Sequence, residues 1–173
     1  MSLQQLNGSY VDTEDRLLFR FTTSTNEEYR LWLTQRITRA LLAFGQRASI
    51  ALLENKHAPS VAKVVDQFQQ EKLGASVQTA AAFAGKPRLP LGATPMLVHY
   101  VEFPVGDRNL FCVQLELSNQ QRLTLRLRQG EFDHLRSLLI QLWKRTPWGE
   151  LPELNPAEES LLQESSTAPP SFH

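Results

Sequence analysis

The 173-residue chain contains a single cysteine, Cys112. It therefore forms no internal disulfide bond, and a lone cysteine favours a reducing compartment. A chain of this length buries enough apolar surface to fold without disulfide or metal support. Cys112 falls on the polar side of an alternating segment, where a small packing residue is the expected role. These features predict a cytoplasmic protein stabilised by its hydrophobic core.

Long apolar runs are also absent. No stretch approaches the roughly 18 apolar residues that a membrane-spanning helix needs. The first six residues, Met-Ser-Leu-Gln-Gln-Leu, lack the basic start and the apolar run of a signal peptide. We therefore expect no membrane partner.

Motifs of known chemistry are missing as well. The chain has no glycine-rich phosphate loop, no GxSxG elbow and no HExxH pair. Its four histidines lack the spacing of a zinc site and lie at His57, His99, His134 and His173. The sequence thus predicts no metal, no cofactor and no catalytic residue. A catalytic site assembled from distant segments stays open as a third class.

The charge is balanced overall but unevenly distributed. Residues 1–149 hold all 18 Lys and Arg and 13 of the 18 acids, a net charge of +5, while 150–173 hold five acids and no Lys or Arg. The second segment is rich in proline and serine and too poor in apolar residues to offset its ordering entropy. We predict a flexible acidic tail. It either associates with the basic body, serves as a docking peptide for another protein, or is inert.

What the sequence does contain is alternation of apolar and polar residues. Residues 110–117 place Phe111, Val113 and two leucines on one side, and 122–128 do the same with three leucines. The four polar residues between them predict a turn, and hence an antiparallel hairpin. From about Glu131 the apolar period becomes helical. That helix covers the apolar face of the hairpin, and ends before Pro147.

A similar pattern occurs near the N-terminus. Asp15-Arg-Leu-Leu-Phe19 matches Asp107-Arg-Asn-Leu-Phe111 at four of five positions. Strands are predicted near 16–23 and 28–34, followed by a helix from about Thr34 to Leu53 with Thr34 as its N-cap. A Tyr-Val pair precedes each hairpin and suggests a third strand in each copy. Chance resemblance of two common strand-strand-helix patterns is the alternative.

The predicted fold is therefore α+β: two pseudo-repeated antiparallel ββ(β)α units joined by a helical linker. Residues 1–149 form one domain, with copy one at about 10–53, the linker at 55–95 and copy two at about 96–148, and 150–173 form the tail. In the linker, valines and Phe68 form a helical stripe, and Asp66 is assigned to the solvated side. The predicted core residues are Phe19, Leu31, Leu41, Phe44, Phe111, Leu125, Leu135 and Leu139.

The candidate site is the polar side of the strands. An open sheet face carrying arginines beside an aromatic ring suits single-stranded nucleic acid, because guanidinium groups neutralise phosphate and the ring stacks on a base. The same face suits a protein partner or self-association. We expect a non-catalytic binding or adaptor protein acting through this face or its tail, with nucleic-acid binding as the alternative. The face residues are Arg20, Arg30, Trp32, Arg126 and Arg128.

Overall fold

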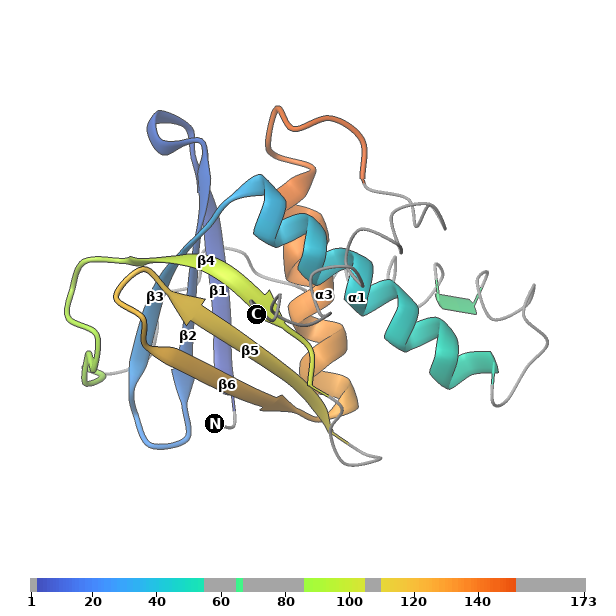
Figure 1. Cartoon of the computed structure of the whole chain (residues 1–173), viewed down its shortest axis with the longest axis horizontal. Helices are drawn as coiled ribbons and strands as arrows, with labels where there is room; N and C mark the ends of the chain where they lie inside the picture. The colour runs from blue at the N-terminus through green and yellow to red at the C-terminus, as the bar shows by residue number, and fades with distance from the viewer. Residues whose placement is uncertain (1–2, 55–64, 67–85, 105–109, 152–173) are drawn as a thin grey trace, which may run out of the picture.

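The computed structural model describes residues 3–54, 65–66, 86–104 and 110–151, and Figure 1 shows their arrangement. These residues form an α+β fold, as the sequence predicts. The elements are β1 (Leu3–Val11), the short 3-10 helix η1 (Asp12–Glu14), β2 (Arg16–Thr23), β3 (Glu28–Leu33), α1 (Gln35–Glu54), β4 (Met96–Glu102), β5 (Phe111–Leu117), β6 (Arg122–Leu127) and α3 (Gln129–Trp143).

The strands form one six-stranded mixed sheet in sequence order, β1 to β6. Every neighbouring pair is antiparallel except β3 and β4, which run parallel and meet at only two residue pairs, Leu31 with Met96 and Trp32 with Leu97. Parallel neighbours require a long crossover, and the chain from α1 to residue 95 supplies it. Three strands followed by a helix occur in each half, so the suggested third strands are present. Superposition of the two halves stays a prediction.

The hairpins β2–β3 and β5–β6 have the same turn. Each loop is closed by a backbone hydrogen bond that spans three residues, from Thr23 N–H to Glu27 O at 2.9 Å and from Leu117 N–H to Gln121 O at 2.8 Å. The last loop residue is left-handed in both, with φ of 56° at Asn26 and 66° at Gln120. This is a common three-residue hairpin geometry. It fixes the register, and hence which side chains face the core.

The core lies between one face of the sheet and the two helices, which lie on the same side of it (Figure 1). Of the predicted core residues, Phe19, Leu31, Leu41, Leu125, Leu135 and Leu139 are buried. Phe44 and Phe111 are only partly buried. They lie at the margin of the core and stack on other rings, Phe44 on Phe103 and Phe111 on Phe132, with centroids 3.9 and 4.1 Å apart.

Helix α1 begins where its N-cap predicts. The Thr34 hydroxyl accepts a 3.4 Å hydrogen bond from the Ile37 N–H, which satisfies one of the helix's unpaired donors. At the start of α3, the Glu131 carboxylate accepts a 2.7 Å bond from the Arg128 N–H. Both helices are thus fixed at the end that joins the sheet.

The assignment of Asp66 to a solvated surface is wrong. Its carboxylate accepts two hydrogen bonds from the Arg136 guanidinium, at 2.6 and 2.7 Å, and both side chains are buried. Gly45 in α1 leaves space for this arginine, because a Cβ there would lie 3.0 Å from Arg136 Cδ. Local periodicity does not reveal such a partner on a distant helix. The rest of the predicted linker helix, the repeat residues Asp107 and Arg108 and tail residues 152–173 lie outside the described residues.

A substitution at Gly8 tests the packing of α3 against β1. A Cβ at Gly8 would lie 2.7 Å from Leu142 Cδ1 and 3.0 Å from the Leu18 carbonyl oxygen. We expect Gly8→Val to lower the free energy of unfolding by about 1–3 kcal/mol, as overpacking does. Urea denaturation measures it. Gly130→Ala is the control, since nothing lies within 4 Å of a Cβ there; equal losses for the two variants would contradict the described packing.

Candidate binding face of the sheet

The face of the sheet turned away from the helices is here named the outer face. Strand alternation places it, because the residues between the core-facing ones point the opposite way. Within the described part of the chain, no helix packs against this face. Its main residues are Leu18, Arg20, Thr22, Glu28, Arg30, Trp32, Leu97, Tyr100, Glu102, Gln114, Glu116, Arg122, Thr124 and Arg126.

The five predicted face residues fall into two groups. Arg20 and Arg30 are directly opposite each other on β2 and β3, and Trp32 follows on β3. Arg126 lies on β6, three strands from β3, and Arg128 directly follows that strand. At about 4.8 Å per strand, roughly 14 Å separate the groups. Trp32 lies outside the core cluster, so its ring belongs to the outer face. The binding role of all five stays a prediction.

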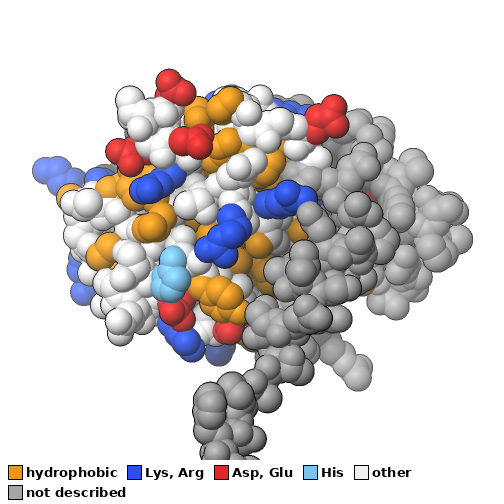
Figure 2. Space-filling model, turned by 45° about the horizontal axis from the view of Figure 1, so that its top comes forward, with side chains coloured by type: hydrophobic (Ala, Val, Ile, Leu, Met, Phe, Trp, Pro, Cys, Tyr) orange, Lys and Arg blue, Asp and Glu red, His pale blue; other side chains and the backbone are white. Residues whose placement is uncertain are grey.

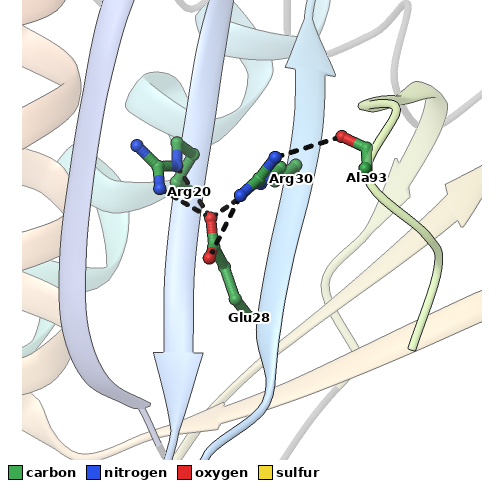
Figure 3. Close-up of polar contacts among 4 residues, drawn as sticks. All are labelled: Arg20, Glu28, Arg30 and Ala93. Carbon is green, nitrogen blue, oxygen red and sulfur yellow. Dashed lines mark hydrogen bonds and ion pairs between the residues drawn. The ribbon is translucent and has the colours of Figure 1, made fainter. Parts of the chain in front are cut away.

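Glu28 joins the first two arginines (Figure 3). Its Oε1 accepts hydrogen bonds from Arg20 Nε at 2.9 Å, Arg20 NH2 at 2.7 Å and Arg30 Nε at 2.8 Å. The Glu28 side chain is 4% exposed and each arginine side chain 29%. Like charges directly opposite each other on adjacent strands are destabilising. Glu28 is the counterion that allows Arg20 and Arg30 to share this position.

Arg20, Glu28 and Arg30 form a triad whose electrostatics favour the charged form of each side chain. Burial alone would raise the pKa of Glu28, but the hydrogen bonds from Arg30 and Arg20 and their positive charges outweigh burial, so its pKa lies below the usual value. The hydrogen bond to Glu28 raises the pKa of Arg30. Arg30 NH1 also donates to the Ala93 carbonyl at 3.2 Å. The triad therefore ties β2 and β3 to the segment that leads into β4.

An apolar strip crosses the centre of the outer face and was missed by the sequence analysis. Leu18 pairs with Trp32, and Trp32 pairs with Leu97 on the parallel neighbour β4. Tyr100, also on β4, is 42% exposed. Alternation in β2 predicts that Leu18 points outward, but Leu97 joins the strip only through the β3–β4 pairing. No local pattern predicts that pairing.

Acidic residues also lie on the outer face. Glu116 on β5 accepts a 2.9 Å hydrogen bond from Arg122 and lies 3.3 Å from His99 Nε2. Glu102 is exposed on β4. Figure 2 shows one side of the molecule, on which basic side chains are mixed with hydrophobic and acidic ones. On this side the charges of the described residues are interspersed rather than gathered in one basic field.

A second polar cluster lies at the β1–β2 turn. Asp15 Oδ1 accepts bonds from Tyr10 Oη at 2.8 Å and Trp148 Nε1 at 2.7 Å. The bonds from Trp148 and Tyr10 lower the pKa of Asp15. Burial, together with the bond to Asp15 and the negative charges of Asp15 and Asp12, raises the pKa of Tyr10 to about 12. This cluster holds the segment after α3 against the turn, which is a structural role.

A cavity bordered by described residues is too small for a ligand larger than water. This cavity of about 10 Å³ lies between α1 and α3, lined mainly by apolar side chains and by Arg136. That is about the space of one water molecule. Among the described residues, no three His, Cys, Asp or Glu side chains gather as a metal site would require, and no described helix is long and apolar enough to cross a bilayer.

Comparisons with protein families, with curated proteins and with solved structures found no match to this chain.

The pH dependence of stability tests the triad. Because the pKa of Glu28 is lowered on folding, its contribution is present above its unfolded value near 4.5 and is lost as the pH falls through the folded value. We expect Glu28→Gln to lower the free energy of unfolding at pH 7 by about 1–3 kcal/mol, and to weaken the loss of stability between about pH 5 and 3. Denaturation at several pH values measures both.

Glu102→Gln is the matched control, since Glu102 is exposed on the same face. A Glu28→Gln variant with the wild-type pH profile would show that the triad contributes nothing to folding.

Proposed function

We propose that this protein is a non-catalytic binding or adaptor protein that recognises another protein through its outer face. The observation that supports this most is the apolar strip of Leu18, Trp32 and Leu97, with exposed Tyr100 on the same face. A hydrophobic centre within a charged surround is the usual anatomy of a protein interface. Trp, Tyr and Arg are also the residue types that contribute most of the binding energy in such interfaces.

A different protein suits the outer face better than a second copy of this chain. Arginines outnumber acids among the residues of this face when Arg128 at the end of β6 is included, so two copies face to face would oppose like charges. The arginines are Arg20, Arg30, Arg122, Arg126 and Arg128, and the acids are Glu28, Glu102 and Glu116. We therefore favour a different protein over self-association as the partner. We also propose that the protein is cytoplasmic and that the acidic tail can contribute to the contact.

Single-stranded nucleic acid is the second candidate ligand. The outward position of Trp32 beside two arginines supports it, because base stacking and phosphate neutralisation then occur on adjacent strands. Glu28 weighs against it. Its carboxylate occupies the Nε–NH2 edge of the two arginines nearest the ring, and a phosphate that binds this edge would have to displace it.

Substitutions at Trp32 in the apolar strip and at the neighbouring Tyr100 test the proposal. We expect Trp32→Ala together with Tyr100→Ala to weaken binding of a protein partner about 30-fold or more, because truncating one aromatic hot spot costs about 2 kcal/mol or more. A photo-reactive residue at position 100 identifies the partner in nuclease-treated extract of the native cells. Affinity is then measured with the purified partner.

The control is Gln4→Ala, an exposed β1 residue that should leave affinity unchanged. A partner that binds the double variant as tightly as the wild type would contradict the proposal. Light scattering would reveal self-association, and a complex lost after nuclease treatment would favour nucleic acid.

A further inference from the structure

The arginines of the outer face differ in what their guanidinium groups contact. Arg20 donates Nε and NH2 to Glu28, and Arg30 donates Nε and NH2 to Glu28 and NH1 to Ala93. The Nε–NH2 edge of each guanidinium, one of the two edges that can bind a carboxylate bidentately, is already occupied. Arg126 and Arg128 are exposed, and among the described residues neither has an ion pair. Among the outer-face arginines, Arg20, Arg30 and Arg122 each have an ion pair, and within the described part of the chain only this second pair has none.

The spacing of that pair indicates the shape of its ligand. Arg126 and Arg128 are two residues apart in an extended chain, with the residue before α3 still extended at φ −71° and ψ 163°. Alternate side chains of a strand repeat every 6.8 Å or so. An extended peptide presents its own alternate side chains at the same interval. Two carboxylates separated by one residue therefore match these two guanidinium groups, each with bidentate geometry.

The surroundings favour an acidic peptide over nucleic acid. The outward residues of β5 and β6 are Cys112, Gln114, Glu116, Arg122, Thr124 and Arg126. None of them is aromatic, so no ring on these strands offers a base a stacking surface. Arg122, which is 60% exposed, lies on the same strand and is partly neutralised by Glu116.

We infer that Arg126 and Arg128 bind alternate carboxylates of an extended acidic segment of the protein partner, whereas Arg20 and Arg30 are structural. This inference rests on the proposed function and assigns the partner's chemistry. It also divides the five predicted face residues into a structural group near Glu28 and a ligand-binding pair at the end of β6.

The test uses the full-length protein and two fluorescent ten-residue peptides, one alternating Glu with Thr and one alternating Gln with Thr. We expect the Glu peptide to bind at about 20 mM salt and to weaken steeply as salt rises, while the Gln peptide does not bind. Arg126→Gln with Arg128→Gln should weaken binding about tenfold or more. Replacing both with Lys keeps the charge but removes the bidentate geometry, and should restore only part of the affinity.

Glu28→Gln discriminates between the two arginine groups. If Arg20 and Arg30 bound the ligand, removing their internal carboxylate would strengthen binding; we expect a change of less than about twofold. Circular dichroism confirms that each variant is folded. Three results would each overturn the inference. The Glu peptide could bind the Arg126→Gln, Arg128→Gln variant as tightly as the wild type, or fail to bind the wild type. A thymidine oligonucleotide could bind the wild type more tightly than the Glu peptide does, with that binding abolished by Trp32→Ala.

If Trp32→Ala with Tyr100→Ala disrupts the natural complex while the Arg126 and Arg128 variants leave it intact, the inference fails and the proposed function stands.

Discussion

The burial of one face of the sheet by both helices is the constraint on which the rest of the structure depends. Apart from Thr23 at the end of β2, the inward residues of β2, β3, β5 and β6 belong to the hydrophobic core or pack against it, and α1 and α3 supply the apolar side chains that cover them. A hairpin alone would leave those residues in water. Because both helices lie on the same side of the sheet, the side chains of the outer face are not needed for the core and can serve in binding.

The polar half of the fold follows from that arrangement. Outward arginines on adjacent strands would repel each other, and a single carboxylate, Glu28, compensates both. The same triad holds the segment before β4 through Ala93, next to the two-residue contact between β3 and β4. Charge compensation on the outer face therefore also supports the junction that makes the sheet continuous. Within the described part of the chain, Arg126 and Arg128 do not form an ion pair that links strands, and we therefore assign the proposed ligand binding to them.

Most elements were predictable because their signals are local. Alternation located the hairpin strands and helical periodicity located α1 and α3 to within about two residues. The parallel contact of β3 with β4 was not predictable, since it joins distant segments and leaves no local pattern, and Asp66 was misplaced for the same reason. For the site, alternation identified the outward residues, but it did not show that Glu28 reaches both Arg20 and Arg30. That depends on cross-strand register, which places Glu28 opposite Thr22 and diagonal to Arg20.

The central claim is that the outer face is accessible in the free protein and is covered by the partner. Hydroxyl-radical footprinting, read by mass spectrometry, measures this side chain by side chain. The account predicts that Trp32 and Tyr100 are oxidised readily in the free chain and become protected in the complex. Trp143, which is 3% exposed, should react slowly in both. If Trp32 and Tyr100 are oxidised as slowly as Trp143 in the free protein, the account is contradicted, because the outer face would then be inaccessible to solvent.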